Sequence, residues 1–478
     1  MSVSALRFAD RPLRSVVGPE DGPVLVVGMG VTGCAVARAL AAHGHEVIVA
    51  DDRPDRATRA AEMAGLTLTE VHDSTEVGLL SSLVIRAAAV APAPGVPPRH
   101  PCYRLADASS TPVVSELDLA AQWDGRPVAA VTGTNGKTTV TTLIERMLNR
   151  SGISAAAAGN TDVALVDAIS EDVDTFVVEA SSFRLCRTRL FAPAVAVWLN
   201  LAPDHLDWHP DFGDYAACKA RIWAHQGPGD VAVAPYGDPG IGPRTAGIEA
   251  RNVTFAAADA LGAPADVRFE AGMLMAFGSP LVDVAALPRK RPHDLSNAAA
   301  ATAAALEMGA SADAVVAGLR SFAGLAHRLA FAGRVGGVSF YDDSKATAPH
   351  ATVAALTGFS DAILIAGGRN KGLDLSDLAE AAAHVRGVVA IGESADAVIG
   401  SFGRLRPHHP EMRRADSMPE AVELAYRMAL PAGDVVLSPG CASFDWYSSY
   451  RDRGQHFIAS VTELRVRHDE LAQREGQQ

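Results

Sequence analysis

Short apolar runs alternate with helix-like stretches along this chain, and most of the apolar runs end at glycine or polar residues. The first run covers residues 24–27, and it is followed by a glycine turn, a helix-like stretch at 34–43 and a second run at 46–50. A continuous apolar run of this length, bounded by turn residues, is typical of a strand buried on both faces of a parallel sheet. The pattern predicts a β-turn-α-β unit.

The same alternation recurs further along the chain. An apolar run at 128–132 precedes a glycine turn at 133–137 and a helix-like stretch at 138–150, and residues 123–127 before it have the composition of a linker. Strands that alternate with helices favour parallel sheets with helices on both faces. The further predicted elements are strands at 175–179, 194–200, 363–366, 388–391 and 435–437, a helix at 294–308 and a loop at 321–334.

Composition narrows the class of protein. The chain has 478 residues, of which 48% are hydrophobic and 20% are charged, which excludes a disordered or collagen-like chain. The formal net charge of −13 speaks against non-specific binding of nucleic acid. We expect neither a membrane span nor a signal peptide, because no apolar stretch is long enough for a span and the first residues are polar.

Cysteine usage leads to a further expectation. The five cysteines are odd in number, lie far apart and form no C-x-x-C pair. We therefore expect neither a disulfide framework nor a structural zinc site, and we expect a reducing cytoplasm as the compartment. The cysteines are Cys34, Cys102, Cys186, Cys218 and Cys441.

The first glycine turn, GMGVTG at 28–33, is a full G-x-G-x-x-G pattern directly after a predicted strand. Such glycines let the backbone approach a pyrophosphate, which the amides at the start of the next helix bind. Asp51 and Asp52 end the second strand, where an acid can contact a ribose, and Arg53 follows them. The pattern favours dinucleotide binding. A tight turn without a ligand and the NAD site of an oxidoreductase stay open as alternatives.

The second glycine turn, TGTNGKTT at 132–139, also lies between a strand and a helix and reads as a P-loop. In such a loop the backbone amides cradle phosphate oxygens, Lys137 supplies positive charge and Thr138 can bind Mg²⁺. Val131 stands where the strict pattern has its first glycine. Two phosphate-binding turns allow one nucleotide to be consumed while a second phosphorylated molecule is bound.

Polar clusters follow several other predicted strands, at the strand ends where open α/β sheets bind ligands. Glu179 ends one strand, and a carboxylate beside a P-loop is well placed to bind Mg²⁺. Residues 200–209 (NLAPDHLDWH) also have side chains suited to a metal, although the H-E-x-x-H pattern of zinc proteases is absent. The remaining clusters are 293–297, 326–329, 341–347, 367–372 and 437–445.

The order of these motifs resembles the Mur ligase family of peptidoglycan synthesis over essentially the whole chain. The family implies an α/β fold of three domains: a Rossmann-like N-terminal domain at 1–124, a central P-loop ATPase-like domain with a parallel sheet at 125–323, and a C-terminal Rossmann-like domain at 324–478. The motifs are GTNGKTT at 133–139, E-x-S-S-F at 179–183, D-H-L-D-x-H at 204–209, H-R at 327–328 and L-S-P-x-x-A-S-x-D at 437–445.

The resemblance implies an ATP-dependent amide ligase that works through an acyl phosphate. The block DSKAT at 343–347 is typical of the member that adds D-glutamate to UDP-N-acetylmuramoyl-L-alanine. Another amino-acid-adding ligase of this type, a folylpolyglutamate synthetase or a P-loop NTPase with a nucleotide-binding module remains an alternative. We expect a monomer in the cytoplasm, without a nucleic-acid or membrane partner.

The resemblance also assigns roles to residues. The catalytic residues would be Lys137, His205 and Lys219, with Lys219 carbamylated. The ligands of two Mg²⁺ ions would be Thr138, Glu179, His205 and Lys219. ATP would be bound by Gly133, Thr134, Asn135, Gly136, Lys137, Thr138, Thr139, Asn297, Arg328, Asp343 and Lys345. The UDP-substrate would be bound by Gly30, Val31, Thr32, Asp52, Arg53, Gly95, Asn160 and Ser181. D-Glutamate would be bound by Thr347, Lys371, Ser443 and Tyr450.

Five positions depart from the family's pattern. Ala93 stands where the S-P-G segment has serine, and Asp162 stands where the G-N-x-G turn has its last glycine. Asp294 and Ala348 stand where asparagine is usual or common, and Ala330 stands where an acidic residue is usual. None of the five lies in the P-loop or among the expected metal ligands.

Overall fold

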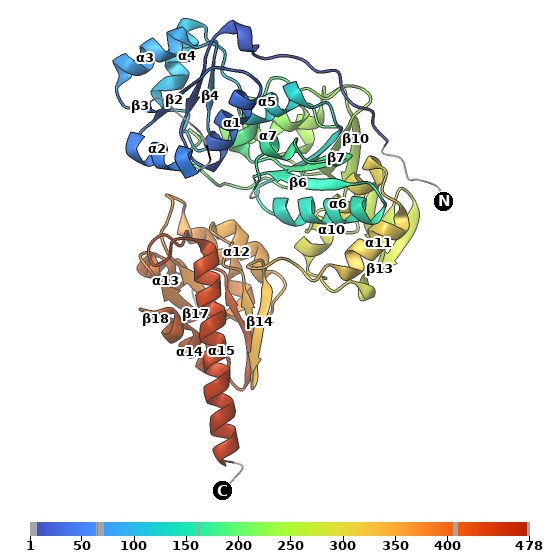
Figure 1. Cartoon of the computed structure of the whole chain (residues 1–478). Coiled ribbons are helices and arrows are strands. Elements are labelled where there is room, and N and C mark those ends of the chain that lie inside the picture. The colour runs from blue at the N-terminus through green and yellow to red at the C-terminus, as the bar shows by residue number, and fades with distance from the viewer. Residues whose placement is uncertain (1–6, 64, 66–70, 161–162, 405–409, 476–478) are drawn as a thin grey trace. The chain divides into compact units, whose positions relative to one another are not determined.

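A computed structural model of the chain (Figure 1) describes residues 7–63, 65, 71–160, 163–404 and 410–475. The chain divides into two compact units. The first comprises the chain up to Leu201 together with Trp208–Leu287 and Ser296–Ser321, and the remaining described residues form the second. Within these described ranges, no helix is both long and apolar enough to cross a membrane.

A parallel sheet with the strand order β3-β2-β1-β4 organises the N-terminal part of the first unit. β1 pairs with β2 and β4 and is buried along its whole length, as its apolar sequence predicts. The helix after the glycine turn begins at Val31 rather than at residue 34, with Gly30 as its N-cap. The elements are β1 (Val24–Val27), α1 (Val31–Ala42), β2 (Val47–Asp51), α2 (Pro54–Met63), β3 (Val71–Asp73), α3 (Val77–Arg86), β4 (Ala89–Pro92), α4 (Pro101–Ser109) and α5 (Glu116–Trp123).

The second sheet of this unit has the order β13-β12-β11-β10-β9-β8-β5-β7-β6. β5 and β7 are parallel neighbours, and their register pairs Val131 with Glu179, so the P-loop and Glu179 leave the sheet at the same edge. The elements are β5 (Val128–Thr132), α6 (Lys137–Arg150), β6 (Ala155–Gly159), α7 (Leu165–Ala168), β7 (Thr175–Glu179), α8 (Ser182–Leu185), β8 (Val195–Trp198), α9 (Phe212–Ala220), β9 (Val231–Pro235), β10 (Arg251–Phe255), β11 (Val267–Glu270), β12 (Met273–Ala276), β13 (Ser279–Asp283), α10 (Pro292–Met308) and α11 (Ala312–Ser321).

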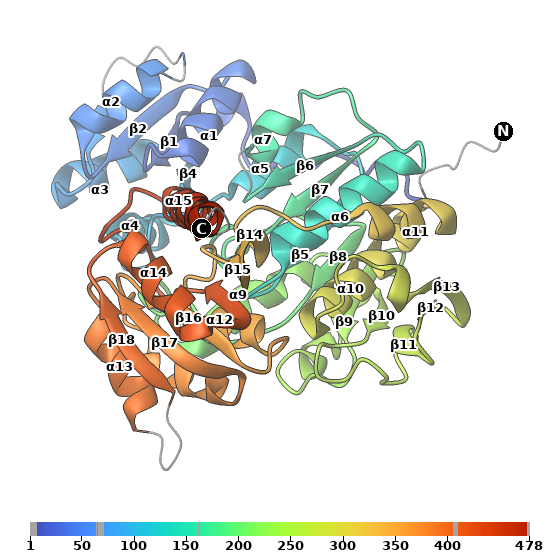
Figure 2. The same cartoon turned by 90° about the horizontal axis from the view of Figure 1, so that it is seen from below.

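Helices cover this second sheet. α6 packs on β5, β6 and β7, and α11 lies beside α6 in both views (Figures 1 and 2). The Ala-rich helix predicted at 294–308 begins at Pro292, and its alanines are almost all buried. A helix that is apolar on most of its faces is typically buried, so the weak amphipathic pattern of this helix agrees with its position. Its small side chains let neighbouring elements pack closely against it.

The second unit has one sheet of order β14-β15-β19-β16-β17-β18, in which β14 and β15 are antiparallel and the other pairs are parallel. The loop predicted at 321–334 is wrong at its end, because β14 begins at Ala330. As an edge strand that contains Gly333, β14 lacks the continuous apolar run of a central strand. The elements are β14 (Ala330–Val335), β15 (Gly337–Asp342), α12 (Pro349–Leu356), β16 (Ala362–Gly367), a 3₁₀ helix (Leu375–His384), β17 (Val385–Ile391), α13 (Ala395–Gly403), β18 (Glu411–Ala415), α14 (Met418–Ala429), β19 (Ala432–Leu437) and α15 (Tyr450–Glu475).

A disulfide joins Cys186 to Cys218, so the expectation that the chain forms no disulfide is wrong for this pair. The two cysteines are 32 residues apart in the sequence, but Cys186 directly follows α8 and Cys218 lies on α9, and these two helices pack together. The spacing of cysteines in the sequence does not predict a contact that depends on how two helices pack. Because one pair is oxidised, cysteine usage no longer supports a reducing compartment.

Gly33→Ala should lower the thermal unfolding midpoint, because the new Cβ would lie 1.9 Å from the carbonyl oxygen of Gly28. Overpacking of this kind costs about 1–3 kcal/mol. Gly30→Ala is the matched control for stability, because no heavy atom outside its chain neighbours lies within 4 Å of that Cβ. Differential scanning calorimetry measures both variants, and equal midpoints would contradict the close approach of the turn.

Candidate functional site

The second glycine turn has the backbone of a phosphate-binding loop. Gly136 is the N-cap residue of α6 and has a φ of 83°, in the left-handed region that favours glycine. A Cβ at this position would also lie 2.4 Å from Oδ1 of Asn297. Because α6 starts at Lys137, its first amides have no partners within the helix, and together with the helix dipole they attract an anion.

Neighbouring side chains hold this turn in place. Asn200 accepts a hydrogen bond from the amide of Asn135 at 2.9 Å and donates one to its carbonyl oxygen at 3.2 Å. The hydroxyl of Thr134, which is buried, lies 3.1 Å from that of Tyr215. These contacts fix the backbone of the turn.

Two lysines converge on the turn. The Nζ atoms of Lys137 and Lys219 each donate to the carbonyl oxygen of Gly133, both at 2.8 Å. Lys219 is only 1% exposed and also lies over the ring of Tyr215, with Nζ 4.5 Å from its centroid. Two ammonium groups on one oxygen repel each other, and an anion bound in the turn relieves that repulsion.

Glu179 lies at the centre of a small polar network beside the turn. It is buried at the end of β7, and its Oε2 accepts a hydrogen bond from the hydroxyl of Thr138 at 2.6 Å. Its Oε1 accepts one from Nδ2 of Asn160 at 3.0 Å. The adjacent hydroxyl and carboxylate are hard oxygen donors of the type that Mg²⁺ prefers.

The first glycine turn opens onto a cavity of about 420 Å³. Asp51 braces this turn, because its carboxylate accepts from the amides of Met29 at 2.7 Å and Arg53 at 2.8 Å. The expected substrate-binding residues that line the cavity are Gly30, Val31, Thr32, Asp52, Arg53, Gly95 and Asn160. Ser181 does not line it. Its hydroxyl is buried and has no hydrogen-bond partner among the described residues.

Sequence reasoning missed two residues of this cavity. Arg184 is buried, donates to the hydroxyl of Thr32 at 2.9 Å and forms an ion pair with Glu116. His100 also lines the cavity, with Nε2 3.3 Å from the carboxylate of Asp52. In the sequence, only the position of Arg184 directly after E-x-S-S-F indicated a role at this site. No motif indicated such a role for His100.

In the second unit, Asp343 lies directly after β15 and is buried. Its carboxylate accepts hydrogen bonds from the hydroxyl of Ser438 at 2.8 Å and the amide of Leu329 at 3.1 Å. Burial raises the pKa of Asp343 to about 7, against the opposing effects of the Ser438 hydrogen bond and the charge of Arg328. The carboxyl is therefore partly protonated near neutral pH.

The other expected residues of the second unit form local pairs. Nζ of Lys345 lies 4.1 Å from the ring centroid of Tyr450, and Nζ of Lys371 lies 3.5 Å from the hydroxyl of Thr347. Burial raises the pKa of Tyr450, but hydrogen bonds and charges from the neighbouring cations outweigh this effect and lower the pKa overall. His205 has a left-handed φ of 56°, and its amide donates to Asp204.

Arg453, which sequence reasoning missed, ties two loops of this unit together. It is buried on α15 and donates to the hydroxyl and carbonyl oxygens of Ser344, at 3.0 Å and 2.8 Å, and to the carbonyl of Cys441 at 3.1 Å. Burial lowers the pKa of Arg453 to about 10. The loop that it holds also carries Ser443, which is itself buried.

Among the departures from the family pattern, Ala93 lines the cavity beside the first glycine turn, and Asp162 lies outside the described residues. Asp294 has a partner, because its Oδ1 lies 2.7 Å from Nε of Arg289. Ala348 is the N-cap residue of α12 and makes no side-chain cap. Ala330 begins β14 and pairs with Asp342 of β15.

Asp343→Asn should remove a fall in stability between pH 3.8 and about 7. The raised pKa of Asp343 means that the native state keeps a proton that the unfolded chain has lost, so the free energy of unfolding falls as the pH rises through this range. Urea denaturation at a series of pH values measures the slope. A slope that is unchanged in the variant would contradict the raised pKa.

Three family models match the chain. The MurD-like N-terminal domain of Mur ligases matches residues 22–115, the Mur ligase middle domain matches 131–305, and the Mur ligase glutamate ligase domain matches 327–441. The first match contains the sheet of β1–β4, the second contains the end of β5 and the strands β6–β13, and the third contains the sheet of β14–β19.

Individual proteins give the same result. A UDP-N-acetylmuramoylalanine–D-glutamate ligase of Frankia casuarinae is 41% identical over 92% of this chain and 93% of its own length. The ligase of that name from Pelotomaculum thermopropionicum is 39% identical over 92% of this chain and 98% of its own. MurF ligase from Thermotoga maritima, solved with ADP, shares the fold with a TM-score of 0.54 and 18% identity, over 99% of this chain and 100% of its own. The chain belongs to the Mur ligase family, together with these UDP-N-acetylmuramoylalanine–D-glutamate ligases.

Proposed function

We propose that this chain joins D-glutamate to UDP-N-acetylmuramoyl-L-alanine in an ATP-dependent reaction that releases ADP and phosphate. The observation that carries this proposal is the presence of two glycine turns in one unit, each leading into a helix N-terminus, at 133–139 and at 28–33, with a cavity beside the second of these. One turn can hold the nucleotide that is consumed while the other holds the nucleotide attached to the substrate. The names of the similar ligases support the same reaction.

In the proposed ATP site, the P-loop amides and Lys137 bind the phosphates, while Thr138 and Glu179 hold Mg²⁺. The hydrogen bond between the last two side chains places hard oxygen donors next to each other, which fits this ion. When bound, Mg²⁺ supplies positive charge to the phosphate oxygens. We propose Asn297, Arg328, Asp343 and Lys345 as further ATP-binding residues, and His205 as a ligand of a second Mg²⁺.

We propose that Lys219 is carbamylated. Its neutral amine would attack CO₂, form an N–C bond and lose a proton, which leaves a carbamate anion. This reaction removes one of the two like charges at the carbonyl of Gly133 and adds oxygen ligands for Mg²⁺. A buried lysine that otherwise faces a second cation is suited to this change.

In the proposed substrate site, the cavity beside the first glycine turn binds the uridine diphosphate. Arg53 supplies positive charge, and Gly30 and Gly95 leave room for the backbone to approach the ligand. Asn160 lines this cavity and also donates to Glu179, so it joins the cavity to the metal-binding side chains. The reacting carboxylate of the substrate would extend along this path.

The proposed chemistry follows from the poor reactivity of a carboxylate. The substrate carboxylate attacks the γ-phosphorus of ATP, the bond to the β-γ bridging oxygen breaks, and an acyl phosphate and ADP form. The neutral amine of D-glutamate then attacks the acyl carbon, loses a proton and expels phosphate. Lys137 and the P-loop amides stabilise charge on the transferring group, so that the chain contributes mainly orientation and electrostatics.

We propose that Thr347, Lys371, Ser443 and Tyr450 bind the carboxylates of D-glutamate. Lys371 already lies within reach of the hydroxyl of Thr347, and a carboxylate can bridge such a cation and hydroxyl. We further propose that the protein acts as a monomer in the cytoplasm, without a nucleic-acid or membrane partner.

Incubation of the chain with ATP, UDP-N-acetylmuramoyl-L-alanine and a mixture of amino acids should yield one product, which contains glutamate of the D configuration. Mass spectrometry and chiral analysis identify the product. Lys137→Ala should abolish its formation, because the variant lacks the cation at the transferred phosphate.

Incorporation of a different amino acid would make the protein another amino-acid-adding ligase. Phosphate release that needs neither acceptor would favour an NTPase switch, and NADH binding at the first glycine turn would favour an oxidoreductase. Near-normal product formation by Lys137→Ala would contradict the role of the P-loop.

Lys219→Ala should lose most activity and regain part of it when small carboxylic acids such as acetate or formate are added. These acids can replace the carbamate as an anionic ligand. Steady-state kinetics with and without the acids measure the effect, with chloride at equal ionic strength as the control. A fully active alanine variant, or rescue by chloride alone, would contradict the carbamate.

A further inference from the structure

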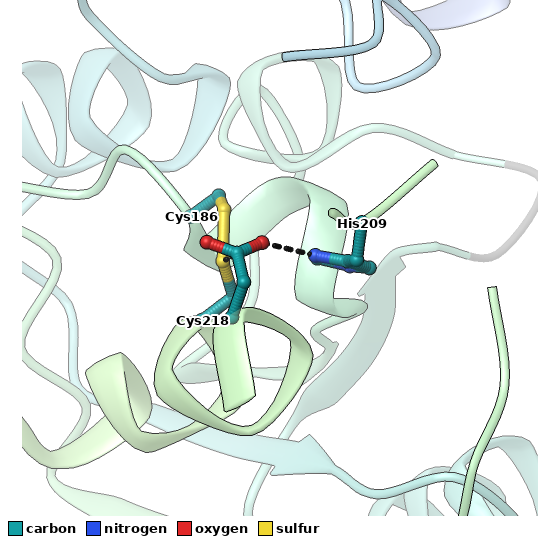
Figure 3. Close-up of side chains that lie close together, drawn as sticks. Cys186, His209 and Cys218 are labelled. Carbon is teal, nitrogen blue, oxygen red and sulfur yellow. Dashed lines mark hydrogen bonds and ion pairs between the residues drawn. A yellow bond between two sulfur atoms is a disulfide. The ribbon is translucent and has the colours of Figure 1, made fainter. Parts of the chain in front are cut away.

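A second group of ligand-type side chains lies outside both nucleotide sites. Figure 3 shows Cys186, His209 and Cys218 close together. The carboxylate of Asp214 joins this group, because its Oδ2 lies 2.7 Å from Nδ1 of His209. One donor atom from each of the four side chains lies within 4.8 Å of the other three. Two sulfurs, an imidazole nitrogen and a carboxylate oxygen form a donor set that none of the proposed catalytic steps uses.

The local fold explains why the four side chains meet. Asp214 and Cys218 are four residues apart on α9, so they share one face of that helix. Cys186 directly follows α8, which packs against α9, and His209 lies in the loop that leads into α9. The oxygen of Asp214 lies 3.8 Å from Sγ of Cys218.

His209 has the surroundings of a metal-binding histidine. It is 1% exposed, and its Nδ1 lies 2.7 Å from Oδ2 of Asp214, on the side of the cysteines. Its other ring nitrogen, Nε2, lies 2.9 Å from the hydroxyl of Ser182. A partner of this kind fixes the orientation and tautomer of a histidine that ligates a metal through its other nitrogen. The rings of Phe183 and Tyr215 pack around it.

We propose that Cys186, His209, Asp214 and Cys218 bind a zinc ion when the disulfide is reduced. Zinc prefers four ligands in a tetrahedron and accepts sulfur, imidazole nitrogen and carboxylate oxygen. The two sulfurs distinguish this site from the hard oxygen sites that suit Mg²⁺. The inference does not depend on the proposed ligase reaction.

The metal and the disulfide exclude each other at this site. A dithiol reductant transfers two electrons to the disulfide and is itself oxidised to a cyclic disulfide, which leaves two thiols on the protein. Binding of Zn²⁺ then displaces one proton from each thiol as the two sulfur–metal bonds form. An azo oxidant such as diamide takes two electrons from the two zinc-bound thiolates and two protons from water, and is reduced to the hydrazine. The sulfur–sulfur bond that forms removes both sulfur ligands and releases the ion.

The site adjoins residues with proposed roles in the reaction. Cys218 immediately precedes Lys219, whose Nζ contacts the carbonyl of Gly133, and Ser182 immediately follows Ser181. A change between the zinc-bound and disulfide states therefore acts on the segment that carries Lys219.

Cobalt binding to the full-length chain tests the proposal. The protein is reduced with a phosphine, freed of metals with a chelator and titrated anaerobically with Co²⁺. We expect one Co²⁺ per chain, with an ultraviolet thiolate-to-cobalt charge-transfer band and the visible bands of tetrahedral cobalt, and we expect Zn²⁺ to displace it. The same chain oxidised with diamide should give neither band.

Variants assign the ligands. Cys186→Ser and Cys218→Ser should each weaken the charge-transfer band and the affinity for the ion, and His209→Gln should weaken the affinity about tenfold or more. Cys102→Ala is the matched control, because it removes a buried free thiol from α4 and should leave binding unchanged.

Absence of the charge-transfer band from the reduced chain, after a thiol assay has confirmed that all five cysteines are free, would overturn the proposal. Equal binding by Cys186→Ser and the unmodified chain would overturn it as well. If a serine variant fails to fold by circular dichroism, the comparison of the reduced and oxidised unmodified chain decides the question on its own.

Discussion

The convergence of two lysine ammonium groups on the carbonyl oxygen of Gly133 is the interaction on which the proposed ATP site depends. The ammonium groups of Lys137 and Lys219 both donate to the carbonyl of Gly133, beside the N-terminus of α6. Two cations and the positive end of a helix dipole in one place attract a negatively charged ligand. The same feature explains why a phosphate ligand suits the turn and why we propose that one lysine becomes an anion.

The charged side chains around the two glycine turns differ. This difference is why we propose a different ligand for each turn. At the P-loop, the hydroxyl of Thr138 on α6 and the side-chain amide of Asn160 both donate to the carboxylate of Glu179. At the first turn, the carboxylate of Asp51 accepts from two backbone amides, and the cavity of about 420 Å³ beside it is lined by both Asp52 and Arg53. We therefore propose the triphosphate for the former and the nucleotide attached to the substrate for the latter.

Sequence patterns over a few residues predicted those strands and turns whose structure depends on neighbouring residues in the chain. The apolar run at 128–132 and the glycines after it became β5 and the P-loop, because burial and turn geometry act over a few residues. Arg184, Arg453 and the Cys186–Cys218 pair were missed because each acts through contacts between segments distant in the sequence. The edge strand β14 was missed because it is only partly buried.

A crystal structure of the chain with a non-hydrolysable ATP analogue and UDP-N-acetylmuramoyl-L-alanine tests the central claim most directly. We expect the triphosphate on the amides of residues 133–139, within reach of Lys137, and the uridine in the cavity beside Gly30 and Arg53. Uridine bound at the P-loop, or the triphosphate bound in the N-terminal cavity, would contradict this claim.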